Sequence, residues 1–119
     1  MNPVSLISGL RASIGVGAYV APNLTGRAFG LDPEGNPQAS FLARLFAIRD
    51  LALAVGTLGS EGDARRRWLQ LGLACDLGDA AAAYLARRDG SLPTPAAVMS
   101  GGTALAAVAV GVAALARPS

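Results

Sequence analysis

The sequence lacks histidine and lysine and contains a single cysteine, Cys75. Without histidine and with one thiol, a single chain forms neither a disulfide framework nor a His/Cys metal site, and His-based catalysis is excluded. Charge is scarce as well, because only 15% of the residues are charged, against about 25% in an average soluble domain. Carboxylate, guanidinium and hydroxyl groups are left for chemistry, and no motif for a metal or an organic cofactor is seen, so we expect neither.

The ten basic residues are all arginine, and eight acids leave a formal net charge of only +2. The arginines are scattered and form no basic stripe, so we expect no nucleic-acid partner. The 119 residues are 52% hydrophobic. This composition predicts one folded domain over residues 1–119, since disordered chains are poor in apolar residues and multidomain enzymes are longer.

Four apolar segments, separated by three polar connections rich in turn residues, organise the chain: residues 4–21, 41–59, 68–86 and 96–116. The last segment contains no charge and is long enough to cross a hydrocarbon core of about 30 Å as a helix. None of the four shows a sustained alternation of apolar and polar residues, which favours helices over strands. We predict an all-α fold, a four-helix transmembrane bundle, located in the cell membrane as a multi-pass protein surrounded by membrane lipid.

A water-soluble four-helix bundle is the alternative, because charged residues interrupt the first three segments. The apolar circumference of the fourth segment argues against it, since a bundle helix in water needs a polar face. The first segment contains Arg11 and no basic residue precedes it. We therefore expect this segment to be mature structure rather than a cleaved signal sequence.

Five charged residues are expected near the middle of the bundle: Arg11, Arg49, Asp50, Asp76 and Asp79. A helix rises about 1.5 Å per residue, which places all five between about 10 and 18 Å from the N-terminal face of the membrane. An ionised side chain at such a depth costs about 2.5 to 3.5 kcal/mol. We therefore predict that the five side chains face the bundle interior and pair with one another.

Two arginines against three aspartates leave one surplus acid. Arg44 could supply the missing charge, although it lies near a helix start and is better placed to reach the interface; otherwise one aspartate is protonated, because burial raises a carboxyl pKa. Asp76 and Asp79 are about 60° apart around a helix, so both can point into one cavity and share a proton. Arg49 and Asp50 diverge by about 100° around a helix, so each is expected to meet a different partner helix instead of the other.

Such a cluster has two interpretations. It is either a buried salt-bridge network that fixes the register of the helices, or a polar pocket at mid-depth that binds a substrate or an ion. The second interpretation leads to our main hypothesis, a membrane-embedded enzyme that performs cofactor-free isomerisation, cyclisation or epoxide opening on a lipophilic small molecule. Asp76 or Asp79 would give or take a proton, Arg11 or Arg49 would stabilise negative charge, and Asp50 completes the set of candidate catalytic residues.

Two other functions use the same residues. A small proton-coupled transporter would titrate these carboxylates and, with so few helices, would act as a homodimer. An accessory or structural membrane subunit would have all charges paired and would dock a larger partner through faces of small residues. The first two functions predict a cavity that touches Asp76, Asp79 and Arg49, whereas the accessory subunit predicts closed ion pairs without a cavity.

The run RLFAIRDLAL at residues 44–53, followed by Asp76 and Asp79 in the next apolar segment, resembles small four-helix membrane proteins of bacteria and fungi that form a domain-of-unknown-function family. The resemblance covers residues 1–116. It implies a four-span bundle with an Arg-acid pair in the second helix, and it implies no activity.

Overall fold

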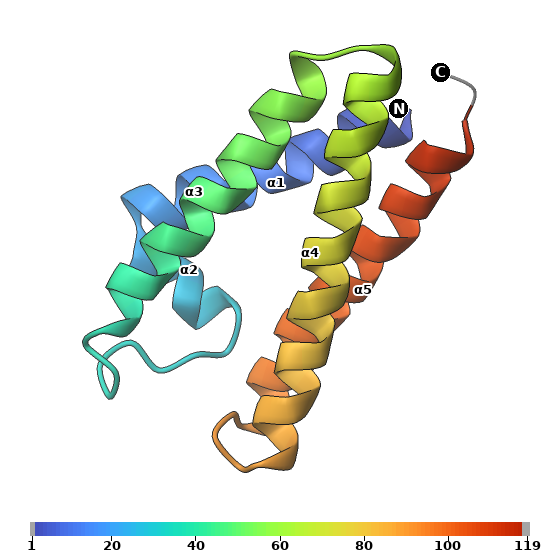
Figure 1. Ribbon diagram of the computed structural model, residues 1–119. Helices are drawn as coiled ribbons and strands as arrows, with labels where there is room; N and C mark the ends of the chain where they lie inside the picture. Colours follow the sequence, from blue (N-terminus) through green and yellow to red (C-terminus); the bar gives the residue numbers. More distant parts are fainter. Residues whose placement is uncertain (1, 118–119) are drawn as a thin grey trace.

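The computed structural model describes residues 2–117, and this part of the chain is helical and contains no strand. The four long helices lie where the apolar segments predicted them, except that the third begins at Gly62 rather than near residue 68. A short additional helix lies in a segment predicted to be a connection. The elements are α1 (Pro3–Val20), α2 (Pro22–Ala28), α3 (Ala39–Leu58), α4 (Gly62–Arg88) and α5 (Thr94–Ala116) (Figure 1).

The helical part of the prediction agrees with the structure, but the four-helix transmembrane bundle is wrong. Residues 2–117 form five helices, and only α1 and α5 are long and apolar enough to cross a membrane. α3 contains Arg44, Arg49 and Asp50, and α4 contains two aspartates between arginine-rich ends, so neither has a long enough uninterrupted apolar stretch. Two candidate spans are compatible with a membrane location, and a four-span topology is not supported.

The break between α1 and α2 follows from Pro22. Proline has no backbone N–H to continue the hydrogen-bond ladder of α1, but it is well suited to the first position of a new helix. α1 therefore ends at Val20, and α2 begins at Pro22, with one residue between the two helices. At its other end α1 begins after Asn2, whose side chain accepts a hydrogen bond of 2.8 Å from the backbone N–H of Ser5, as helix-capping residues do.

Two glycines end α2 and α4 in the same way. Gly30 and Gly90 have φ angles of 80° and 83°, in the left-handed region that residues other than glycine rarely adopt. The N–H of Leu31 then bonds the carbonyl of Gly26 at 2.9 Å, and the N–H of Ser91 bonds the carbonyl of Ala86 at 3.0 Å. These reversed turns satisfy carbonyl groups that a helix end would otherwise leave free.

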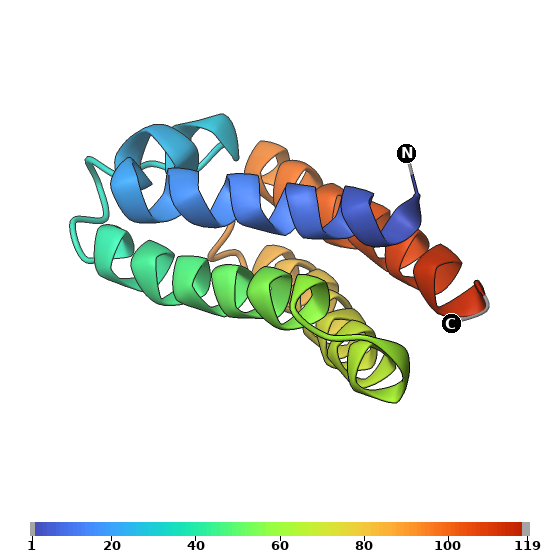
Figure 2. The same ribbon diagram turned by 90° about the horizontal axis from the view of Figure 1, so that it is seen from above.

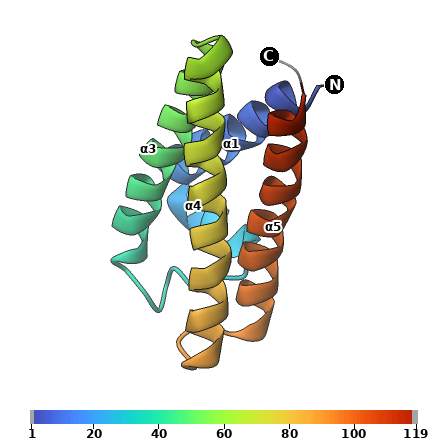
Figure 3. The same ribbon diagram turned by 45° about the vertical axis from the view of Figure 1, so that its right-hand side comes forward.

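The long helices form two pairs. α1 packs along α3 and α4 packs along α5, and the pairs meet through α1 with α5 and through α3 with α4 (Figure 2). The two pairs are inclined to each other, and α2 lies toward the end where they diverge (Figure 1). The start of α1, the end of α5 and the α3–α4 turn lie at the opposite end (Figure 3). This arrangement leaves the region between the pairs to be filled by side chains rather than by helix-to-helix packing.

The core is small and consists mostly of alanine. Ile7, Leu69, Ala107 and Ala114 form its main cluster, where the N-terminal half of α1 meets α4 and α5. Large apolar side chains are instead exposed on each of the four long helices: Leu6, Val16, Val20, Phe41, Leu42, Ile48, Val55, Leu71, Leu77, Leu85, Val98, Leu105 and Val112 are among them. An exposed apolar surface of this extent indicates contact with lipid or with another apolar partner.

Candidate functional site

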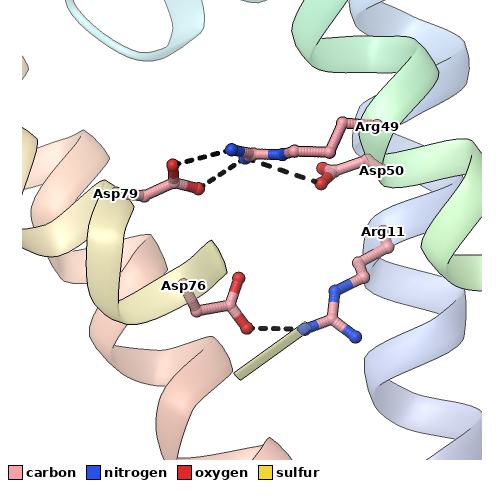
Figure 4. Close-up of polar contacts among 5 residues, drawn as sticks. All are labelled: Arg11, Arg49, Asp50, Asp76 and Asp79. Atoms are coloured by element: carbon pink, nitrogen blue, oxygen red, sulfur yellow. Dashed lines mark hydrogen bonds and ion pairs between the residues drawn. The ribbon is translucent and has the colours of Figure 1, made fainter. Parts of the chain in front are cut away.

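Arg11 of α1 is buried in the space between the two helix pairs. Only 3% of its surface is exposed, and its Nη2 donates a hydrogen bond of 2.6 Å to Oδ2 of Asp76 (Figure 4). Asp76 belongs to α4, whereas α1 packs on α3 and α5. The long arginine side chain therefore joins two helices whose backbones do not pack together.

Gly72, one turn before Asp76 in α4, makes room for this guanidinium. A Cβ atom on Gly72 would lie 2.5 Å from Nη2 of Arg11 and 2.6 Å from its Cζ, distances that real side chains do not tolerate. Any other residue at this position would push the guanidinium away from its place. The ion pair of Arg11 with Asp76 therefore depends on a residue that carries no functional group.

The second ion pair joins Arg49 of α3 to Asp79 of α4. Nη1 and Nη2 of Arg49 donate to the two carboxylate oxygens of Asp79 at 3.0 and 2.6 Å, a two-point contact that fixes the planes of both groups (Figure 4). The ring of Phe46 lies under the guanidinium, 4.5 Å from Cζ to the ring centroid. Arg49 is thus held from two sides.

Asp50 is the surplus acid of the cluster. It is 5% exposed, and within residues 2–117 its carboxylate takes part in no hydrogen bond. Its ion-pair contact is with Nη2 of Arg49 at 3.9 Å, and that nitrogen already donates to Asp79. A buried carboxylate with so little compensation is harder to ionise than one in water.

Burial raises the pKa of Asp50 from its usual value of 3.8 to about 6. The positive charges of Arg49 and Arg11 oppose this increase, and the negative charges of Asp76 and Asp79 add to it. Burial also raises the pKa of Asp76, but there the guanidinium of Arg11 opposes the effect by its charge and by its hydrogen bond. Asp50 and Asp76 lie on α3 and α4, outside the two candidate spans.

A pocket of about 480 Å³ opens beside the cluster, within the range of about 300 to 1,000 Å³ typical of small-molecule sites. Its charged lining residues are Arg11, Asp50, Asp76 and Asp79, and the rest of the wall is mainly apolar. The apolar wall comes from every helix: Leu10, Ile14 and Ala18 of α1, Pro22 of α2, Ala39, Leu42, Ala43 and Phe46 of α3, Ala82, Ala83 and Ala86 of α4, and Ala104 and Ala107 of α5.

The charges lie at one end of this pocket. Along α3 the lining residues run from Asp50 back to Ala39, a distance of about 16 Å at 1.5 Å per residue. α2 and the segment after it, through Phe29 and Leu31, complete the wall at the far end. The pocket therefore has the shape and polarity to hold an elongated, lipophilic molecule with its polar group at the cluster.

The five residues predicted as a site do come together (Figure 4). Arg49 reaches α4 as predicted, but the prediction that Arg49 and Asp50 meet different helices instead of each other is wrong for Asp50, whose ion-pair contact is with Arg49. The prediction that Asp76 and Asp79 share a proton is wrong, since each pairs with a different arginine. Arg49 is not among the residues that line the pocket, which corrects the prediction of a cavity touching it.

Arg44 does not supply the missing positive charge. Its Nε donates to the backbone carbonyl of Tyr19 at 3.0 Å, and its Cζ lies 5.9 Å from the centre of the Tyr19 ring. It thus sits at the end of α1 and joins α1 to α3 near the first turn of α3. The surplus acid is therefore Asp50, which has no guanidinium of its own and whose pKa burial raises to about 6.

Sequence reasoning missed Gly72 and the contribution of α2 to the pocket. Gly72 resembles the other glycines of the apolar segments, so nothing in its local pattern distinguishes it. Pro22, by contrast, is both a helix terminator and a favoured first residue of a helix, and this second property is a signal for α2.

No cluster of three or more acidic, histidine or cysteine side chains within residues 2–117 is arranged to hold a metal ion. Comparison with known proteins gives no further guidance, because no family model, no curated protein and no solved structure matches this chain. The resemblance to a four-helix family of unknown function stays a prediction. Function has to be argued from the geometry of the site.

Proposed function

We propose that this protein is an enzyme that holds a lipophilic small molecule in the pocket between its helix pairs and isomerises, cyclises or opens it by proton transfer. The observation that carries the proposal is Asp50, a buried carboxyl without a hydrogen bond at the polar end of a mainly apolar pocket. A general acid works best when its pKa is near the working pH, and burial brings the pKa of Asp50 to about 6. This assigns the proton to Asp50 rather than to Asp76 or Asp79.

The charges of the cluster suit such a reaction. With Asp50 protonated, the two arginines balance the two carboxylates that they bind. Asp50 then gives its proton to a neutral substrate, which becomes positively charged as Asp50 becomes a carboxylate. When the substrate loses a different proton back to Asp50, an isomerised or cyclised product leaves and the site returns to its first state. No redox partner or cofactor is required for this balance.

The other charged residues act as positioning residues. Arg11 and Arg49 hold Asp76 and Asp79 in place beside Asp50 through their hydrogen bonds. The carboxylate that Asp50 becomes favours the positive charge that develops on the substrate, and the two ion pairs beside it are already oriented before the reaction, so little reorganisation is needed. The mainly apolar wall gives a lipophilic substrate surroundings of matching polarity.

We further propose that the protein works at a membrane, with lipid against α1 and α5. These two helices are long and apolar enough to cross a bilayer, and the exposed apolar side chains of the long helices need an apolar environment. A lipophilic substrate concentrates in such an environment. The substrate, most of the pocket wall and the lipid around the protein are then all apolar.

The proposal can be tested without knowing the substrate. A lipid extract from cells that contain the gene is incubated with the purified protein in D₂O and analysed by chromatography and mass spectrometry. Protonation on carbon would leave deuterium in the product, and opening of an epoxide would change its retention time. We expect such species with the parent protein and with Asp63→Asn, a change at an exposed position of α4, but not with Asp50→Asn.

Product formation that is equally fast with Asp50→Asn would contradict the assignment of Asp50. The pH dependence gives a second criterion, since the protonated carboxyl is the active form. We expect the rate to increase as the pH falls through about 6, which follows from the raised pKa of Asp50. A rate that decreases over this interval would assign a different group to the proton transfer.

The cavity also bears on the two alternative functions. An accessory subunit with closed ion pairs leaves no reason for a pocket beside them, so the geometry supports it least. A proton-coupled transporter would use the same pocket and the same titrating carboxyl. It would leave the lipid extract chemically unchanged, and its pH-dependent uptake into proteoliposomes would be lost in Asp50→Asn.

A further inference from the structure

The charges of the cluster beside the pocket do not cancel when all are ionised. The cluster contains the guanidinium groups of Arg11 and Arg49 and the carboxylates of Asp50, Asp76 and Asp79 (Figure 4). Arg11 is bound to one carboxylate at 2.6 Å, and Arg49 is bound to another through two hydrogen bonds. Asp50 is left with one long contact of 3.9 Å. The site therefore carries one uncompensated negative charge.

Both arginines are engaged with carboxylates other than Asp50. Arg11 lies in the space that Gly72 leaves on α4, so leaving Asp76 would also empty that space. Arg49 is fixed by its two-point contact with Asp79 and by the ring of Phe46 beneath it. Among the described residues that line the pocket, Arg11 is the one cation. The charge that would complete the site has to come from outside the protein.

We infer that the pocket selects a lipophilic molecule with a single positive charge, which places its cationic centre beside Asp50 and its apolar body along α3 toward Ala39. Three observations carry this inference: Asp50 has no hydrogen bond to the part of the chain that the structure describes, it is almost fully buried, and it lies at the polar end of an apolar wall about 16 Å long. The inference rests on the proposed function in one respect, namely that the pocket is a ligand site.

Charge complementarity predicts the order of affinities. With all five groups ionised, the cluster has a net charge of −1. A bound monocation brings this net charge to zero, an alcohol leaves it at −1, and a carboxylate makes it −2. Burying uncompensated charge is unfavourable, so the cation should bind most tightly and the anion least. The same preference fits the proposed reaction, because a neutral substrate becomes a monocation when Asp50 protonates it, and an alkylammonium ion resembles that state.

The test compares three probes with the same alkyl chain: decylamine, decan-1-ol and decanoate. Binding is measured by isothermal titration calorimetry to the full chain in nanodiscs of zwitterionic lipid at pH 7.5, with empty nanodiscs as the reference for partition into lipid. We expect decylamine to bind about tenfold or more tightly than decan-1-ol, a preference of the size expected for one partly buried ion pair. Decanoate is expected to bind most weakly of the three.

Two variants test whether the preference for decylamine comes from Asp50. Asp50→Asn keeps the size of the side chain and removes its charge, so the affinity for decylamine should fall to that for decan-1-ol. Ala43→Phe fills the apolar wall and should weaken all three probes equally, because Ala43 lines the pocket away from the charges. A preference for decylamine that persists in Asp50→Asn overturns the inference.

The comparison of probes on the parent protein decides the matter even when Asp50→Asn does not fold. If the probes bind equally well and Ala43→Phe weakens them, the inference is wrong and the proposed ligand pocket stands. If none binds beyond the empty-nanodisc reference, the ligand pocket itself is wrong and both proposals fail. Tighter binding of decanoate than of decylamine also overturns the inference.

Discussion

Replacing Asp50 by asparagine is expected to change how the free energy of unfolding depends on pH. In the folded protein burial raises the pKa of Asp50 from 3.8 to about 6. Below about pH 4 the carboxyl is protonated in both the folded and the unfolded state, so it adds no pH dependence there. Between about pH 4 and 6 the unfolded chain loses this proton more readily than the folded protein. Folding stability therefore decreases as the pH rises through this interval.

The magnitude follows from the difference between the two pKa values. A difference of about 2 corresponds to about 3 kcal/mol, which is the most that ionisation of Asp50 can remove from the stability of the parent protein. Asp50→Asn cannot ionise, so its stability relative to the parent should improve by up to about 3 kcal/mol between pH 4 and pH 8. Comparing the variant with the parent at each pH largely cancels the contribution of the other titrating groups.

The measurement is equilibrium unfolding in guanidinium chloride, followed by the helical circular dichroism signal in a nonionic detergent at several pH values. Asp89→Asn is a control with the opposite sign. Asp89 is exposed, and hydrogen bonds from Ser91 lower its pKa, so this variant should lose stability relative to the parent as the pH rises. A stability difference between Asp50→Asn and the parent that stays constant from pH 4 to pH 8 would refute the reasoning.

Two glycine substitutions test the close contacts. Gly72→Ala should destabilise the protein by about 1 to 3 kcal/mol, because the added Cβ displaces the guanidinium of Arg11. Gly78→Ala in the same helix is the control: its Cβ would meet nothing within 4 Å, so it should stabilise the protein by about 0.5 to 1 kcal/mol. Equal unfolding free energies for the two variants would contradict this reasoning. Gly56→Ala should shift the fluorescence of Trp68 to longer wavelength, because the Cβ would overlap the indole ring that packs on this glycine, and an unchanged spectrum would show that the ring is not held there.

The helices were largely predictable from the sequence because their signals are local. Long apolar stretches bounded by proline, glycine and charged residues predicted α1, α3, α4 and α5 to within a few residues at most ends. The convergence of the five charged residues was also predictable. Each one lies near the middle of its helix, and the constant rise per residue places them at similar heights once the helices run antiparallel.

The pairing within the cluster was not predictable, because it depends on how the two helix pairs are inclined and on where a side chain is missing. Arg11 binds Asp76 in the space that Gly72 leaves, and Arg49 makes its two-point contact with Asp79 rather than with Asp50. Asp50 becomes the surplus acid through this geometry. Nothing in the sequence distinguishes Asp50 from Asp76 and Asp79 as the acid that is left without an arginine of its own.

The membrane topology and the pocket were likewise predictable only in part from the sequence. Composition alone indicated an apolar environment, but the charges inside α3 and α4 leave only α1 and α5 as candidate spans. The pocket exists because the two pairs diverge and α2 closes the wider end, which no local pattern specifies. The sequence by itself thus determined the helices and the residues capable of chemistry, since both depend on neighbours along the chain. Tertiary structure alone decided which carboxyl is left unpaired in an apolar cavity, since that depends on distances between segments far apart in the chain.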